Sequence, residues 1–151
     1  MISRLNNEQM EELLKQQCIG RIGCHADGVT YVVPISYAYD GRYIYAHTHE
    51  GMKVQMMRKN PQVCFEVDDT ANMANWKSVI GWGEFEELNE PQKRIQALDH
   101  LLGRKLPFNS SATTHLGPCW PFSGSDPGEI KGIVFRILLQ KKTGRLEVPD
   151  N

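Results

Sequence analysis

Two histidines, a glycine and a lysine lie close together in the stretch YAHTHEGMKV, residues 45–54. His47 and His49 are two positions apart, so on a β-strand they would share one face and could both reach a divalent cation. Apart from Glu50, no third ligand is near them in the sequence. A catalytic base would need an orienting carboxylate and a nucleophile, which the stretch does not supply. We therefore expect no metal and assign no catalytic residue.

The same stretch has the features of a phosphate site. A strand that ends at Thr48, followed by Gly51 and the first turn of a helix, presents free backbone N–H groups and the positive end of the helix dipole. Gly51 lets the backbone approach an anion closely, and Thr48 adds a hydroxyl donor. Lys53 contributes a full positive charge. These features indicate an anion site, with an ordinary strand-to-helix junction as the alternative.

The segments around this stretch are mostly of the β type. Runs rich in β-branched and aromatic residues predict strands at 19–24, 29–39, 42–48, 62–69, 76–88 and 132–140. Apolar spacing and start and stop signals predict helices over 6–16, 51–60 and 89–102, the last with Ile95, Leu98, Leu101 and Leu102 on its buried side. Asp40-Gly41 favours a tight hairpin turn, and Gly81 and Gly83 suggest a bend or bulge.

Six strands with hairpin connections cannot form a doubly wound parallel sheet, because strands and helices do not alternate. We expect a mainly β fold, a six-stranded antiparallel barrel with helices at its openings, in a single domain over 1–151. A Pro-, Gly- and Ser-rich connection at 103–130 is long enough to be functional or to cover something. Thr143-Gly144 is expected to start a short final turn.

Composition excludes several classes of partner. Seventeen basic residues against eighteen acidic ones leave a formal charge of −1, so we expect no nucleic acid partner. The apolar runs are too short to span a bilayer and the N-terminus lacks a signal-peptide core, which predicts a cytoplasmic protein with no membrane partner. The four cysteines form no C-x-x-C pair and are expected to be buried or half-buried thiols. Cys24, beside His25, is the one that could be exposed and redox-active.

The run VVPISYAYDGRYIYAHTHEGMKVQMMRKNPQVCFEVDD, residues 32–69, resembles the core of the pyridoxamine 5'-phosphate oxidase-like flavoproteins. The shared features are a strand pair joined at Asp-Gly, an aromatic strand ending in His or Thr, a basic residue two positions after Gly or Ser, and a helix closing on Asn-Pro. The resemblance extends through NWKSVIGWGEFEEL, 75–88, and covers roughly residues 17–100. Within the superfamily it is nearest to the nitroimidazole-resistance-like proteins. It implies an FMN-binding split β-barrel.

The resemblance also implies the cofactor-binding residues Val33, Pro34, Ile35, Ser36, Ala46, His47, Thr48, Met52, Lys53, Ser78 and Trp120. The first four match the strand along the flavin ring, and the next three match the strand end at the ribityl phosphate. Lys53 matches the lysine that pairs with this phosphate. Gly51-Met52-Lys53 stands where the oxidases carry Ser-Arg-Lys, so one charge is lost and His47 is a substitute donor.

Two of these assignments have structural alternatives. Ser78 stands where the family places a polar contact to the flavin, and it is otherwise a plain strand residue. Trp120, with Pro121 and Phe122, would cover the ring from the long loop, or would plug the barrel. Trp82 is expected to be in the core or a dimer interface rather than in contact with the ligand.

The family's proteins are homodimers with two FMN sites at the subunit interface, and the resemblance implies the same here. The ending TGRLEVPDN, 143–151, lacks the Trp- and Arg-rich segment of genuine pyridoxamine 5'-phosphate oxidases, so that oxidation is not expected. We expect an FMN-dependent oxidoreductase of the flavin or nitro-compound reductase type, with a small-molecule electron donor and acceptor. The alternatives are a non-catalytic binding or stress-response module and a relative that binds heme or a deazaflavin.

Overall fold

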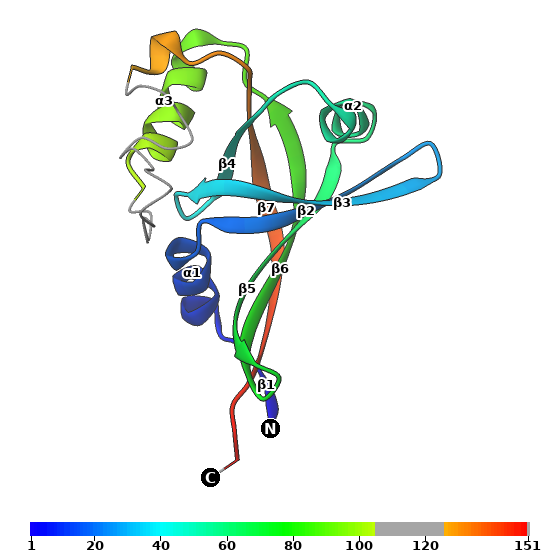
Figure 1. Ribbon diagram of the computed structural model, residues 1–151, viewed down its shortest axis with the longest axis vertical. Coiled ribbons are helices and arrows are strands. Elements are labelled where there is room, and N and C mark those ends of the chain that lie inside the picture. The colour runs from blue at the N-terminus through cyan, green and yellow to red at the C-terminus, as the bar shows by residue number, and fades with distance from the viewer. Residues whose placement is uncertain (105–125, 151) are drawn as a thin grey trace, which may run out of the picture.

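A computed structural model of the chain describes residues 1–104 and 126–150 (Figure 1). In chain order, its elements are β1 (Ile2–Arg4), α1 (Asn7–Gln16), β2 (Ile19–Ala26), β3 (Val29–Tyr39), β4 (Tyr43–Thr48), α2 (Met52–Lys59), β5 (Gln62–Asn72), β6 (Asn75–Glu87), α3 (Pro91–Leu102), the short 3₁₀ helix η1 (Pro127–Glu129) and β7 (Ile133–Glu147). No helix in this part of the chain is long and apolar enough to cross a bilayer.

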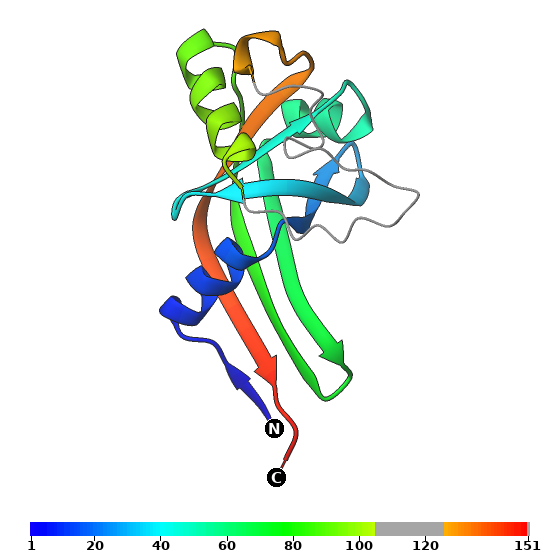
Figure 2. The ribbon, with the colours of Figure 1, turned by 60° about the vertical axis from the view of Figure 1, so that its left-hand side comes forward.

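Six strands close into a ring of antiparallel neighbours in the order β7-β4-β3-β2-β5-β6, and β6 pairs again with β7. This confirms the mainly β, six-stranded antiparallel barrel. β1 is an additional short strand that pairs with the far end of β7. In Figure 2, β5, β6 and β7 run side by side past the ring toward the chain termini.

The final turn expected at Thr143-Gly144 is wrong, because β7 continues to Glu147. Thr143 pairs with Ile80 and Gly144 with Val79, so the long strand β6 supplies backbone partners for these residues. The bulge expected around Gly81 and Gly83 is confirmed as a shift of register between Trp82 and Gly83.

The ring opens between β3 and β4. These strands pair only from Tyr37 to Tyr39, opposite Ile44 to Ala46. The rest of β3, Val29 to Ser36, pairs with β2, while His47 and Thr48 at the end of β4 pair with β7. α2 follows β4 here and packs against β2 (Figure 1). This divergence is the split of the barrel.

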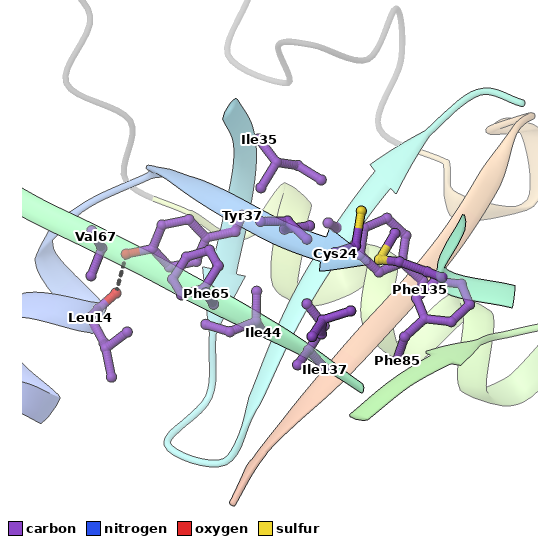
Figure 3. Close-up of a cluster of buried hydrophobic side chains, with 14 of the residues drawn as sticks. Leu14, Cys24, Ile35, Tyr37, Ile44, Phe65, Val67, Phe85, Phe135 and Ile137 are labelled. Carbon is purple, nitrogen blue, oxygen red and sulfur yellow. Dashed lines mark hydrogen bonds between the residues drawn. The ribbon is translucent and has the colours of Figure 1, made fainter. Parts of the chain in front are cut away.

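Apolar side chains from the strands, α1 and α2 fill the barrel interior. Tyr37 is fully buried, packs edge-on against Phe65 at 4.8 Å between ring centroids, and donates its hydroxyl proton to the Leu14 carbonyl at 2.7 Å (Figure 3). α1 adds Leu13 and Leu14 to this core, and α2 adds Met56 and Met57. These two helices pack at the openings of the barrel, as expected.

α3 packs instead on the outer wall. Its buried residues Ala97, Leu98 and Leu101 pack with Ala38, Tyr45 and Val134, which alternate with the inward-facing residues of β3, β4 and β7. Ile95, expected on the buried side, is 43% exposed, because a helix on one wall buries only a narrow stripe.

Local signals explain where the elements begin and turn. α1 starts with a capping box, in which the Asn6 side chain accepts from the Gln9 N–H and the Gln9 side chain accepts from the Asn6 N–H. At the β3–β4 turn, Gly41 has φ +98° and the Asp40 carboxylate accepts from the N–H groups of Arg42 and Tyr43. The predicted hairpin turn is therefore correct.

Candidate functional site

The residues predicted to lie along a flavin ring occupy β3 at the split. Ile35 is 7% exposed and Val33 is half-buried against the core, so both face inward. Pro34 is exposed and Ser36 half-buried, because alternate residues of a strand face opposite sides. A ligand on the outer face would meet these two side chains and only the backbone of Ile35. Ala46 of β4 is likewise fully buried and has only its backbone to offer.

The N-terminus of α2 has no side-chain cap. Its N-cap residue is Gly51, whose extended backbone leads into Met52 and Lys53, and no side chain of residues 1–104 and 126–150 caps the first-turn N–H groups. α1 and η1, in contrast, have side-chain caps from Asn6 and Asp126. Among the described residues, a methyl group at Gly51 would meet nothing closer than the His49 carbonyl at 4.0 Å. These N–H groups are available to an anion.

Lys53 lies in the first turn of α2 and is half-buried. Burial lowers the pKa of its ammonium, although the nearby Cys24 thiol opposes this. Within residues 1–104 and 126–150, no carboxylate lies at ion-pair distance from it. Lys59, at the other end of the helix, is exposed and pairs with Asp27 at 2.6 Å. Lys53 is therefore a cation held in place without a counter-charge from this part of the chain.

The acidic residue closest in sequence to this site is neutralised. Glu50 pairs with Arg58 at 2.6 Å, and Arg58 also binds Glu87 through two hydrogen bonds. These bonds hold the pKa of the Glu87 carboxyl below its ordinary value. The entrance to α2 thus keeps the positive charge of Lys53 together with the dipole of the helix.

His47 is held by the segment before β7. Its Nε2 donates to the Lys131 carbonyl, and its ring meets His49 edge-on at 5.4 Å. Burial is the main cause that lowers the pKa of His47, so its neutral form is favoured. Arg94 of α3 supports this segment through the carbonyls of Ile130 and Gly132. No signal in the sequence pointed to Arg94, because a basic residue on a helix is usually solvated.

Thr48 ends β4 beside this histidine and is half-buried. Its hydroxyl donates to the His49 carbonyl at 3.5 Å, a long and weak contact. His47 and Thr48 at the end of β4, and Lys53 in the first turn of α2, therefore lie on either side of one strand-to-helix junction. No group of three or more metal-ligating side chains occurs in the described chain.

Ser78 lies elsewhere on the sheet. β2 and β5 separate its strand, β6, from β3. Its hydroxyl donates to Glu66 at 3.3 Å, in a cluster where Arg21 binds Asp68 at 2.8 Å. Burial and the neighbouring Asp68 raise the pKa of Glu66. A flavin contact for Ser78 stays a prediction. Trp120, Pro121 and Phe122 lie outside the described residues.

A row of outward-facing residues crosses the barrel wall next to β3. Val32, Gly23, Cys64 and Trp82 pair successively across β3, β2, β5 and β6. Val32 is 65% and Trp82 42% exposed, so of the two places expected for Trp82 the core is excluded, because the side chain faces outward, and a dimer interface stays a prediction. The exposed, redox-active thiol considered for Cys24 is also wrong, because Cys24 is 3% exposed and burial raises its pKa. Cys18 and Cys64 are free, half-buried thiols as expected.

Sequence reasoning missed Arg104, which follows α3. This half-buried guanidinium donates to the Ser36 hydroxyl, to the Tyr37 carbonyl at 3.0 Å and to the Leu101 carbonyl at 2.8 Å. It therefore touches the strand that was expected to carry the flavin ring.

The comparisons with known proteins agree with this architecture. The family model described as pyridoxamine 5'-phosphate oxidase matches residues 6–145. An uncharacterised protein of Rhizobium meliloti is 32% identical in an alignment of 152 positions that covers 93% of this chain and 92% of that protein. The crystal structure of a FAD-binding protein from Mesorhizobium loti is 30% identical, with a TM-score of 0.73 over 97% of this chain and 98% of that one.

A third similar protein, named for 5-nitroimidazole antibiotic resistance, comes from Bacteroides thetaiotaomicron. It has 18% identity and a TM-score of 0.72, over 97% of this chain and 87% of that one. At this identity the likeness shows a shared fold.

Proposed function

The chain belongs to the pyridoxamine 5'-phosphate oxidase family, whose model spans residues 6–145, and from that premise we propose that it is a flavin-dependent oxidoreductase that binds FMN at the split between β3 and β4. The family and the FAD-binding relative from Mesorhizobium loti support a flavin. The local geometry supports the phosphate end of that flavin at α2.

The observation that carries this proposal is Lys53. A half-buried ammonium without a counter-charge costs free energy, which an anion beside it would offset. The uncapped N–H groups of α2 are next to it in the chain and also suit an anion. A phosphate monoester would use both, and Gly51 leaves room for its approach. The residues present therefore fit the phosphate of a flavin nucleotide.

The ring of the flavin would lie along the outer face of β3, where Pro34 and Ser36 are accessible. Proline has no N–H, so the polar edge of the ring would need the neighbouring backbone groups and the Ser36 hydroxyl. A bound flavin supplies electron and hydride transfer, while the protein binds the ring, orients it and controls access to it. A small-molecule donor and acceptor would meet the ring from the open side.

FMN and FAD share the ring, the ribityl chain and the first phosphate, so one cradle suits that common part of both. FMN remains our proposal, and its test is the mass of the small molecule released when the purified protein is denatured. Oxidised-flavin absorption bands with an FMN mass would support it, and an FAD mass would replace FMN by FAD. A colourless protein that also fails to bind added flavin would overturn the proposal.

Two lysines of α2 give a matched test of the phosphate cradle. We expect Lys53→Ala to weaken FMN binding about tenfold or more, the size of a charge-assisted contact of about 1.5–3 kcal/mol. Lys59→Ala removes an equal charge from the exposed end of the same helix and should leave FMN affinity unchanged. The measurement is a fluorescence titration of the flavin-free protein with FMN. Equal affinities in the two variants would remove the phosphate from this site.

We also propose that the protein is a homodimer. The outward-facing apolar row of Val32, Cys64 and Trp82 on the barrel wall supports a second copy as its partner, since large apolar side chains gathered on one face usually mark an interface. Turnover is tested by following reduced nicotinamide in the presence of nitroaromatic or flavin acceptors. A flavin-loaded protein that accelerates none of these reactions would be a flavin-binding protein without this activity.

A further inference from the structure

Arg104 joins the end of α3 to β3 at the split of the barrel. Its Nε donates to the Leu101 carbonyl in the last turn of α3. Its Nη1 donates both to the Ser36 hydroxyl and to the Tyr37 carbonyl. One planar group thus fixes a helix end, a strand carbonyl and a side chain in a single arrangement.

The contact falls where β3 leaves β4. Tyr37 is the first residue of β3 that pairs with β4, opposite Ala46, whereas Ser36 pairs only with Ile19 of β2 in the described ladder. The Tyr37 side chain is already fixed by Phe65 and by the Leu14 carbonyl. The core therefore holds the Tyr37 side chain inside the barrel, and Arg104 adds a hydrogen bond to the Tyr37 carbonyl from the outside.

Nothing in the described chain balances the charge of this arginine. No carboxylate in 1–104 or 126–150 lies within ion-pair distance, and burial lowers the pKa of the guanidinium. Arg136, also half-buried, is paired with Glu86 at 2.8 Å. A partly desolvated cation without a carboxylate partner in this part of the chain costs free energy.

The hydrogen bond from Arg104 also restricts the direction in which the Ser36 hydroxyl points its own proton. Because the Ser36 oxygen accepts from Arg104, its own O–H must point to another acceptor. A donor that is itself hydrogen-bonded to a cation is polarised and donates more strongly. Flavin rings carry nitrogen and oxygen acceptors along their polar edge, and Ser36 faces the side of β3 proposed for the ring.

We propose that Arg104 is a positioning residue that fixes the Ser36 hydroxyl and the backbone of β3 for hydrogen bonding to the flavin ring. This inference rests on the proposed flavin function of the same strand. It predicts an effect on the bound cofactor that acts through Ser36, in addition to any effect on folding.

Three variants and one control test the inference. Arg104→Gln removes the positive charge and the paired hydrogen bonds to Ser36 and Tyr37. Arg104→Lys keeps the positive charge without the planar guanidinium. Ser36→Ala removes the hydroxyl that accepts from Arg104. Arg136→Gln removes a half-buried arginine that touches Glu86 and lies outside the proposed site. Each protein is first checked for folding by circular dichroism and thermal unfolding.

The first readout uses the flavin-free protein. We expect amide hydrogen exchange over residues 33–37 to quicken in Arg104→Gln and to remain as in wild type in Arg136→Gln. Unchanged exchange in Arg104→Gln would overturn the positioning role, whether or not the protein binds a flavin. If Arg104→Gln fails to fold, Arg104→Lys and Ser36→Ala provide the same comparison.

The second readout is the affinity and reduction potential of bound FMN. Arg104→Gln should weaken binding about tenfold, as expected for one lost charge-assisted hydrogen bond, with Ser36→Ala similar and the double variant no worse than either. The potential should fall in Arg104→Gln, because a nearby positive charge favours the reduced, anionic flavin. Wild-type binding with unchanged values in the variants would overturn this inference alone. Wild type that binds no flavin would overturn the proposed function.

Discussion

At the scale of single residues, the site contains a lysine with no carboxylate partner in the described part of the chain and a histidine whose ring is already hydrogen-bonded to a backbone carbonyl. Lys53 is half-buried with no carboxylate partner within residues 1–104 and 126–150, whereas His47 uses its Nε2 on the Lys131 carbonyl. A ligand phosphate therefore has more to gain from Lys53 than from this nitrogen of His47. The substitute-donor role of His47 stays a prediction.

The pKa of His47 gives a pH-dependent prediction. It lies below the ordinary value of 6.5 in the folded protein, mainly because of burial, so the unfolded chain binds this proton more readily. The contribution of His47 to stability is therefore fully present above about pH 6.5 and is lost as the pH falls through the folded pKa. Two-dimensional NMR of the flavin-free protein should show His47 titrating below the ordinary value of a histidine.

The control for this prediction is His47→Gln, whose amide can still donate to the Lys131 carbonyl but does not titrate. The difference in unfolding free energy between wild type and this variant should change between pH 7.5 and pH 5. A difference that stays constant over this range would show that the protonation of His47 is not linked to folding.

At the scale of elements, β6 and β7 can run together for so long because glycine occupies the bulge. A methyl group at Gly83 would lie 1.9 Å from the Leu138 carbonyl, so the two backbones approach too closely there for any side chain. The longest pairing of the ring thus depends on a position that only glycine can fill.

We expect Gly83→Ala to lower the free energy of unfolding by about 2–3 kcal/mol, because the backbone of β7 must move away. Gly51→Ala is the matched control, since its backbone is extended and, in the described part of the chain, the nearest atom to its added methyl is the His49 carbonyl oxygen at 4.0 Å. The free energy of unfolding of Gly51→Ala should differ from that of wild type by only a few tenths of a kcal/mol. Urea unfolding of both variants measures the effect, and equal stabilities would contradict the tight approach.

At the scale of the whole molecule, α3 covers one part of the outer surface of the barrel, and another part exposes large apolar side chains. α3 covers the wall formed by β3, β4 and β7, where Leu98 and Leu101 are buried. The wall formed by β2, β5 and β6 carries Trp82 exposed on its outer face, in a row with the exposed Val32 of the neighbouring part of β3. The homodimer that we propose would cover this second wall.

We expect wild type to sediment as a dimer and Trp82→Glu to shift toward the monomer, because a charge would have to be buried at the interface. Met73→Glu is the control, since Met73 is 92% exposed at the β5–β6 turn and lies away from this wall. Analytical ultracentrifugation of the three proteins makes the comparison. A wild-type monomer, or a Trp82→Glu variant that remains dimeric, would contradict this interface.

Much of this protein was determined by local sequence signals. The capping residue Asn6, the Asp40-Gly41 turn and the alternation along each strand act over a few neighbouring residues, so the sequence alone was enough to predict most elements and the antiparallel barrel. The junction of Thr48, Gly51 and Lys53 was predictable for the same reason, since a strand end and a helix start are adjacent in the chain.

Only the tertiary structure decided what depends on distant partners. The outward direction of Trp82, the burial of Cys24, the continuation of β7 past Thr143 and the contact of Arg104 with Ser36 all follow from which strands and helices meet. Residues 36 and 104 are far apart in the chain, and their approach depends on α3 packing on the outer wall. Pairing and burial over such separations are properties of the closed ring, and no short window of the sequence contains them.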